Sequence, residues 1–280
     1  MYSFIMTLKT RDRIFFSFFI LSIIAIIFYV AFLIYSIVTK NLVAPVNEVR
    51  PLNFSVGKRL YTYNFTASLI SILTFLVYVS VVTFVLFSGF ETTQSTEIVY
   101  FLGFVLSCFI EGTRLFLPIF GLWKTNSILV YFIGRCVFAA RIMAPLSLLF
   151  SAIFSDADLR QDVDKNIIIL LVISILFAVL VPINTTYFFT TCTVPWSYRE
   201  LFNAMRIVFF CLTLITIIVN AIKSSSVELR EYCYGFVILM IGYSLLQVAD
   251  NYFTLISAAV LFGVGTTVYL KSIHTIYMWK

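Results

Sequence analysis

The sequence predicts an all-α fold, a polytopic transmembrane helical bundle with about eight spans, from its composition, its segment lengths and its few charges. Hydrophobic residues make up 61% of the 280 residues and charged residues only 11%, and the mean hydropathy is +1.04. Soluble domains have about 45–50% apolar and about 25% charged residues, so this chain has too little charge to cover a water-facing surface. Its apolar segments reach the roughly 20 residues that a bilayer core about 30 Å thick requires. We therefore expect residues 1–280 to form a single transmembrane domain, with no soluble domain.

The first span is expected at 14–38, directly after Lys9, Arg11 and Arg13. A cleaved signal peptide has a shorter apolar region of about 7–15 residues, followed by a cleavage site with small residues. This segment is longer and has no such site, so we interpret it as an uncleaved anchor. The polar connection that follows, 39–64, is long enough for a short surface element but not for a catalytic domain.

Five further apolar segments follow the first. The connections between them are polar and mostly short, as is typical of helix bundles. These segments are expected to cross the membrane at 66–89, 97–122, 127–153, 166–189 and 204–222.

The last apolar stretch, 232–270, is too long for one membrane helix. At about 1.5 Å per residue it would be about twice as long as the bilayer core is thick. The pair Asp250–Asn251 near its middle favours a turn, so we expect two helices at 232–249 and 252–270. Seven spans result instead if one of these halves lies in the interface or re-enters the bundle.

The orientation is predicted from the bias of Lys and Arg toward cytoplasmic loops. With eight spans, nine basic residues lie on the face that carries both termini and six on the opposite face. The first group is Lys9, Arg11, Arg13, Arg160, Lys165, Lys223, Arg230, Lys271 and Lys280, and the second is Lys40, Arg50, Lys58, Arg59, Lys124 and Arg199. This excess predicts a plasma (inner) membrane protein with both termini in the cytoplasm, although the basic 39–64 connection would then face outward.

Two charged residues fall near the centres of expected spans, Glu111 in the third and Arg141 in the fourth. A charge at the centre of a membrane helix costs about 2.5–3.5 kcal/mol on insertion scales, so it requires compensation. Arg114 lies nine residues before the connection at 123–126 and Arg135 nine residues after it, which places the two at similar depth in an antiparallel hairpin. Glu111 and Arg141 follow about one and two helical steps deeper. This spacing predicts a cluster of one carboxylate and three guanidiniums.

Three roles are open for the cluster Glu111, Arg114, Arg135 and Arg141. It is an ion-pair network that fixes helix packing, a site for an anionic ligand, lipid headgroup or partner acid, or a gating or proton-relay site at Glu111. Binding is suggested by the formal surplus of two positive charges, because Arg keeps its charge and binds phosphate and carboxylate through paired hydrogen bonds. Arg135 and Arg141 are six positions apart, roughly 120° around a helix, so one of them is expected to face a different helix.

Four other polar residues are secondary candidates. If Asp250 lies deep in the bundle, its carboxylate offsets the surplus positive charge of the arginines, with Gln247 on the same helix face. Otherwise Asp250 is part of a hydrated hairpin turn. Asn184 marks a helix end or kink, or lines a cavity. Arg206, near the start of the sixth span, is expected to be either an anchor whose side chain reaches the interface or part of the buried polar set.

The sequence argues against enzymatic, metal-binding and nucleic-acid-binding functions. It has one histidine, no CxxC pair and no catalytic motif such as HExxH or a P-loop, so neither a metal nor a cofactor is expected. The net charge of +6 is spread over short loops, which fits anionic lipid headgroups better than nucleic acid. Gly263 and Gly265 form a G-x-G pattern, which without a preceding strand predicts close helix packing and not a nucleotide site.

The expected function is that of a non-enzymatic multi-pass membrane protein, a sensing or accessory module whose buried cluster binds an anion, a lipid headgroup or a partner. The alternative is a transporter or channel for a small anion or lipid, which would favour helices interrupted by Gly and Pro. The chain has 10 Gly and 6 Pro, and its interior helices are expected to be largely unbroken. The expected partners are the lipid bilayer, an anionic small molecule or lipid headgroup, and another membrane or signalling subunit.

Overall fold

The computed structural model describes residues 8–45, 48–49, 62–90, 95–124, 127–154, 163–224 and 227–278. In this part of the chain almost all regular structure is helical. The α-helices are α1 (Leu8–Val38), α2 (Phe65–Gly89), α3 (Thr96–Glu111), α4 (Phe116–Ile119), α5 (Ile128–Ile153), α6 (Val163–Leu180), α7 (Arg199–Ser224), α8 (Val227–Gln247) and α9 (Tyr252–Met278). Two 3-10 helices, η1 (Gly112–Leu115) and η2 (Leu122–Lys124), flank α4, and two short strands, β1 (Glu48–Val49) and β2 (Phe188–Phe189), pair in parallel.

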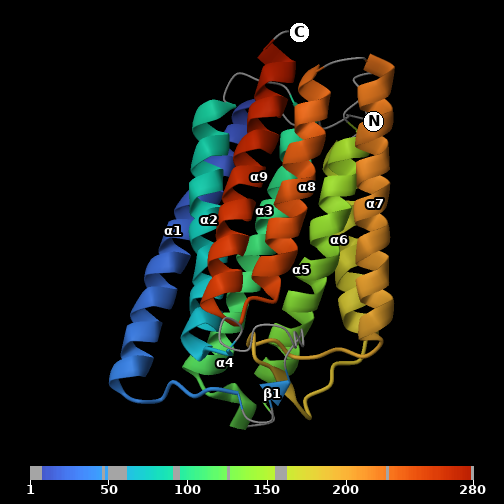
Figure 1. Cartoon of the computed structure of the whole chain (residues 1–280). Coiled ribbons are helices and arrows are strands. Elements are labelled where there is room, and N and C mark those ends of the chain that lie inside the picture. The colour runs from blue at the N-terminus through green and yellow to red at the C-terminus, as the bar shows by residue number, and fades with distance from the viewer. Residues whose placement is uncertain are drawn as a thin grey trace.

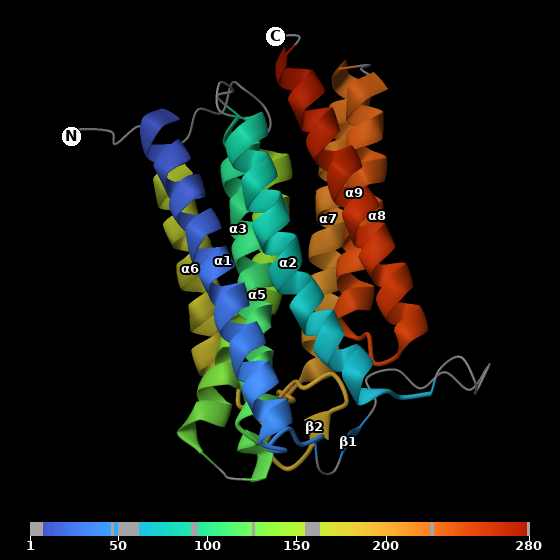
Figure 2. The same cartoon turned by 90° about the vertical axis from the view of Figure 1, so that its left-hand side faces the viewer.

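The predicted all-α bundle is confirmed. Within the described residues, seven helical segments are long and apolar enough to cross a membrane, with α3, η1 and α4 counting as one segment, and α6 is a shorter apolar helix. α1 begins and α9 ends at the same end of the bundle (Figures 1 and 2). The described chain therefore runs along the bundle an even number of times, which agrees with the expectation of about eight passes.

The helices α3 and α5 form the centre of the bundle, and the other helices surround them (Figures 1 and 2). In their apolar windows 67% and 72% of the residues are buried, against 11% for α1 and 17% for α7. The outer helices present large apolar side chains such as Ile27 and Ile222, which are more than 60% exposed. Lipid, and not water, is the solvent that such a surface requires. Because the charged residues of interest lie on the central pair, they are among the most enclosed groups of the protein.

The expected span at 166–189 is too long, because α6 ends at Leu180. Pro182 disfavours helical backbone at Val181, so the helix stops before it. The following residues, 181–198, which we call the cap segment, fold under the end of the bundle opposite the termini. Two isolated bridges and the pairing of β2 with β1 shape this segment. Its residues from Phe188 to Trp196 are buried, so it is a packed part of the fold.

The third span is continuous from Thr96 to Ile119, as expected, but its winding tightens where α3 changes to the 3-10 helix η1 at Gly112. A Cβ atom at Gly112 would collide with the side chain of Leu76 on α2, so glycine lets η1 pack closely there. The tighter winding of a 3-10 helix brings residues i and i+3 nearly into line. This places Arg114 directly over Glu111.

The last apolar stretch forms two helices, α8 and α9, as predicted. Their connecting turn lies inside the bundle, above the segment that contains β1 in Figure 1. Asp250 and Asn251 in this turn are 7% and 4% exposed, so the alternative of a hydrated hairpin turn is wrong. The backbone N–H of Asn64, the N-cap residue of α2, donates to the carbonyl of Asp250 at 2.9 Å and ties the turn to α2.

Glycines bring the backbones of α8 and α9 into direct contact. A Cβ atom at Gly235 would lie 2.6 Å from the backbone N of Tyr269, and one at Gly242 would collide with the backbone of Phe262. Gly265 meets the backbone of Leu239 in the same way, as the G-x-G pattern predicts, whereas Gly263 faces open space. Small residues drive this kind of packing in membranes, where apolar burial gives no preference for another helix over lipid.

We predict that Gly265→Val lowers the free energy of unfolding by about 1–3 kcal/mol, because an added side chain must push α8 away from α9. Val264→Leu is the control, at the exposed neighbouring position on the same helix, and it should leave stability nearly unchanged. Melting of the purified variants in one detergent compares them. Equal melting temperatures for the two variants would contradict the packing described for this hairpin.

Candidate functional site: a buried ion-pair cluster

The carboxylate of Glu111 is the centre of a buried cluster of charged groups. Glu111 is the last residue of α3 and is completely buried. Its Oε2 lies 2.8 Å from Nε of Arg114, and its Oε1 accepts a hydrogen bond of 2.8 Å from Nε of Arg141. Nη2 of Arg141 donates to Oε2 at 3.5 Å. One carboxylate therefore serves two guanidiniums from two elements, η1 and α5.

A third guanidinium joins the cluster through an amide. Nε2 of Gln247, the last residue of α8, donates to Oε1 of Glu111 at 3.1 Å. Oε1 of Gln247 accepts a hydrogen bond of 2.6 Å from Nη2 of Arg206 on α7. The amide can satisfy both neighbours only in this orientation, because a carboxylate needs a donor and a guanidinium needs an acceptor. Gln247 therefore links α3, α7 and α8 at one point.

Backbone carbonyls supply further acceptors to Arg114, which is completely buried. Its Nη1 donates to the carbonyls of Thr191 at 3.4 Å and Gln247 at 3.5 Å, and its Nε donates to the carbonyl of Glu111 at 3.2 Å. The carbonyl of Thr191 is free to accept because the cap segment is not helical. The carbonyl of Gln247 is free because α8 ends there, and the last carbonyls of a helix have no partner within it.

Aromatic rings close the cluster on two sides. The guanidinium carbon of Arg141 lies 5.2 Å from the ring centre of Trp196 in the cap segment, and that of Arg114 lies 5.6 Å from the ring centre of Phe75 on α2. Such contacts favour a cation when water is excluded. Oγ1 of Thr190 donates to Oδ2 of Asp250 at 3.2 Å, which fastens the cap segment to the α8–α9 turn. The cap segment therefore covers the cluster.

The cluster has more donors than acceptors. Among the described residues, Glu111 is the carboxylate that pairs with Arg114 and Arg141, and Arg206 reaches it only through Gln247. Three guanidiniums and one carboxylate leave a formal surplus of two positive charges. Nη2 of Arg114, Nε of Arg206 and the hydroxyl of Tyr243 are buried and have no hydrogen-bond partner within the described part of the chain. Leaving a buried donor unpaired costs about 1–3 kcal/mol, so these three groups would gain from an additional acceptor.

Of the four predicted cluster residues, the structure brings together Glu111, Arg114 and Arg141 but not Arg135. The side chain of Arg135 is exposed on α5, and the prediction that it joins the cluster is wrong. Six positions along a helix turn a side chain by roughly 120°, so Arg135 and Arg141 cannot face the same neighbour. Arg135 points to the outside of the bundle.

The secondary candidates divide in the same way. Gln247 and Arg206 belong to the cluster, and Arg206 is therefore more than an interface anchor. Asp250 lies in the buried turn and bonds to Thr190. Asn184 lies in the cap segment, where its side chain accepts hydrogen bonds from the N–H and hydroxyl of Thr186 and stabilises a local turn.

Sequence reasoning missed Tyr243, Thr191 and Trp196. The spacing of Tyr243, four residues before Gln247 on one helix face, could have pointed to it. The two cap residues come from an irregular segment, and its fold has no periodic pattern in the sequence. Within the described residues, no group of three or more His, Cys, Asp or Glu side chains gathers where a metal ion would bind.

Comparison with known proteins adds no family to this picture. No protein-family model matches the chain, and the search of curated proteins finds no match. The interpretation of the site therefore depends on its geometry and charge.

We predict that Arg141→Leu destabilises the protein by about 3–5 kcal/mol, the usual cost of removing one partner of a buried pair. Glu111→Gln should be comparably severe, because it leaves two guanidiniums without their anion. Arg135→Leu, six residues away on the same helix, and Lys124→Ala at the surface are the controls and should melt close to the parent. If Arg141→Leu and Arg135→Leu melt at the same temperature, the Glu111–Arg141 pair does not stabilise the fold.

Proposed function

We propose that this protein is a non-enzymatic multi-pass membrane module that binds a small anionic group, carboxylate or phosphate, at the Glu111 cluster. The observation that carries the proposal is the surplus of buried donors, with Arg114, Arg206 and Tyr243 each holding one unpartnered polar atom. Guanidinium groups bind carboxylates and phosphates through paired hydrogen bonds, and in a buried site such bonds are strengthened by the low dielectric. An anion bound at these atoms would offset the surplus charge and supply acceptors for the free donors.

The same contacts suggest how binding is communicated. Among the described residues, Arg206 is joined to the cluster by its bond to Gln247, and α7 is one of the two least buried spanning helices. An anion at the free Nε of Arg206 adds a second partner beside Gln247 and so changes how firmly α7 is held against the bundle. α7 also follows the cap segment directly in the chain. We infer that α7 is the element through which occupancy reaches a partner subunit, as a sensing or assembly module requires.

Transport of a small anion or lipid is the second candidate, supported by interruptions at the level of the cluster. α3 gives way to η1 next to Glu111, and the α8–α9 turn lies at the same depth. Pro145 in α5 has no N–H to donate to the carbonyl of Arg141, which frees a backbone acceptor beside the cluster. Interrupted helices around a buried charged site are typical of transporters.

Anion binding is tested by melting the purified protein in phosphate, sulfate or acetate against chloride at equal ionic strength. We expect at least one of the three anions to raise the melting temperature, since a ligand at 100 times its Kd adds about 2.7 kcal/mol. Arg206→Gln should lose the effect and Arg135→Gln should keep it. Without a test anion, Glu111→Gln should have a lower melting temperature than the parent. The added anion should raise it by more than it raises that of the parent, because the anion replaces the missing carboxylate.

The proposal fails if none of the three anions shifts the parent relative to chloride. It also fails if Arg135→Gln and Arg206→Gln respond alike. Uptake of labelled phosphate or acetate into vesicles that contain the protein, above that of empty vesicles and lost in Arg206→Gln, would favour transport over sensing.

We further propose that the protein lies in the plasma (inner) membrane with both termini in the cytoplasm. A cytoplasm-active reporter fused after Lys280 should be active, and a reporter that requires export should be inactive at the same position. Placed in the connection between Asn41 and Asn64, the two reporters should behave in the opposite way. The reverse result would invert the orientation while leaving the fold unchanged.

A further inference from the structure

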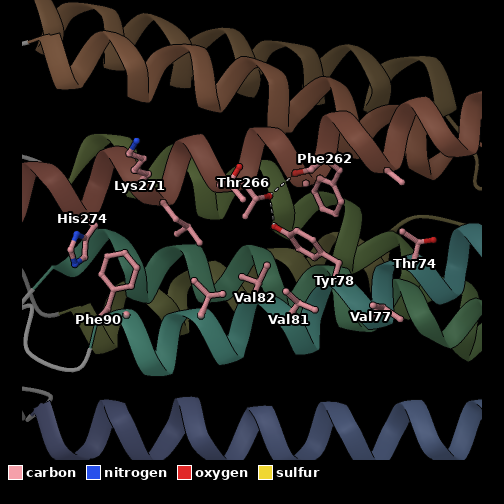
Figure 3. Close-up of a pocket in the computed structure, with 16 residues that line it drawn as sticks. Thr74, Val77, Tyr78, Val81, Val82, Phe90, Phe262, Thr266, Lys271 and His274 are labelled. Atoms are coloured by element: carbon pink, nitrogen blue, oxygen red, sulfur yellow. Dashed lines mark hydrogen bonds between the residues drawn. The ribbon is translucent and has the colours of Figure 1, made fainter.

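A groove separate from the cluster runs between α2 and α9 on the outer face of the bundle (Figure 3). Its volume is 540 Å³, within the range of about 300–1,000 Å³ typical of small-molecule sites. It extends along α2 from Thr74 to Phe90 and along α9 from Ala259 to His274. At about 1.5 Å per helical residue its length is about 22 Å, most of the thickness of the bilayer core.

The groove has an apolar interior that opens outward. Val77 and Val81 on its rim are 50% and 56% exposed, so the groove faces whatever surrounds the bundle. Its floor is the stacked pair of Tyr78 and Phe262, whose ring centres are 3.9 Å apart. The hydroxyls of Tyr78 and Thr266 bond to each other at 3.0 Å, so the polar atoms of the floor are satisfied (Figure 3). Hydrocarbon is the material that such a surface accepts.

Charge is confined to one end of the groove. His274 lies beside Phe90, with ring centres 5.5 Å apart, and Lys271 lies three residues earlier on α9, both toward the end near the chain termini and away from Thr74 (Figure 3). The carbonyl of Phe90 also accepts a hydrogen bond of 2.7 Å from Arg11, which is paired with Asp12 at 2.9 Å and so leaves Lys271 and His274 as the basic groups of this end. Among the described residues that line the groove, none is Asp or Glu. The groove therefore combines a long apolar channel with a basic end at the membrane surface.

The dimensions distinguish a lipid chain from a protein helix as the occupant. The empty space of the groove, about 1210 Å³ with its open side included, gives a mean cross-section of about 55 Å² over this length, whereas a helix is about 10–12 Å across with its side chains and has a cross-section near 80 Å² or more. A helix can rest on the rim but cannot enter. A single extended hydrocarbon chain is thin enough to follow the groove along its whole length.

We propose that this groove binds one acyl chain of an anionic membrane phospholipid, with the lipid phosphate at Lys271 and His274. The chain lies on the floor formed by Tyr78 and Phe262, in the seam between α2 and the tightly packed α8–α9 hairpin. Gly263 widens the groove, because nothing lies within 4 Å of a Cβ atom placed there. The bound lipid joins the hairpin to α2, so its loss loosens a contact that the side chains alone do not complete.

The test offers the purified protein an equal mixture of phosphatidylglycerol and phosphatidylcholine and measures retained lipid by native mass spectrometry. The parent should retain one phosphatidylglycerol in clear preference. Lys271→Gln combined with His274→Gln should lose this preference, while Arg230→Gln, an exposed cation on α8, should keep it. Gly263→Phe should lose the bound lipid, and Val264→Phe on the neighbouring exposed position should retain it. Because Gly263 faces open space and glycine is a poor helix former, the filling variant is expected to fold.

Equal retention of the two lipids by the parent would overturn the proposal, as would full retention of phosphatidylglycerol by Gly263→Phe. If Gly263→Phe instead converts a dimer to a monomer with no change in bound lipid, the groove is an interface between two copies and the proposal is wrong. None of these results depends on whether the Glu111 cluster binds an anion.

Discussion

The carboxylate of Glu111 is the constraint on which the arrangement of the bundle depends. It is completely buried among three arginines, and among the described residues it is the carboxylate that pairs with Arg114 and Arg141. Each of its contacts fixes one element in depth and rotation: η1 through Arg114, α5 through Arg141, and α8 with α7 through Gln247. A shift of any of these helices by one turn, about 5.4 Å, would leave a buried charge without its partner. Packing of apolar side chains alone would not exclude such shifts, because lipid is as apolar as the helix surfaces.

Irregular backbone is the second requirement of the site, since one carboxylate cannot satisfy three guanidiniums. The carbonyls that Arg114 uses come from the cap segment and from the end of α8, where the helix dipole is also negative. Backbone without helical hydrogen bonds is tolerated at membrane depth only where protein surrounds it, and the burial of the cap segment meets this condition. The interruptions of the helices are thus part of how the charges are accommodated.

Much of this could be predicted from the sequence, and the parts that could not have a common cause. Hydropathy and segment length predict about eight passes and the division between α8 and α9. Counting residues from a shared loop predicts the pairing of Glu111 with Arg114 and Arg141. Arg135 lies outside the cluster because six positions along α5 turn it by roughly 120° from Arg141, and the sequence indicates that the two side chains diverge but not which of them faces Glu111. The role of Arg206 depends on where α7 lies, and the cap segment depends on contacts with elements distant in sequence. Such tertiary information is not contained in local periodicity.

The position of the cap segment has a consequence for biogenesis. It is synthesised before α8 and α9, yet it docks against the turn between them through Thr190 and Asp250. A nascent chain that has inserted only as far as α7 therefore holds Arg114 and Arg206 without Gln247, and Thr190 without Asp250. The last hairpin, already rigid through its glycine contacts, completes the site when it arrives. Quality-control factors that recognise exposed polar groups in the membrane would have this interval in which to act.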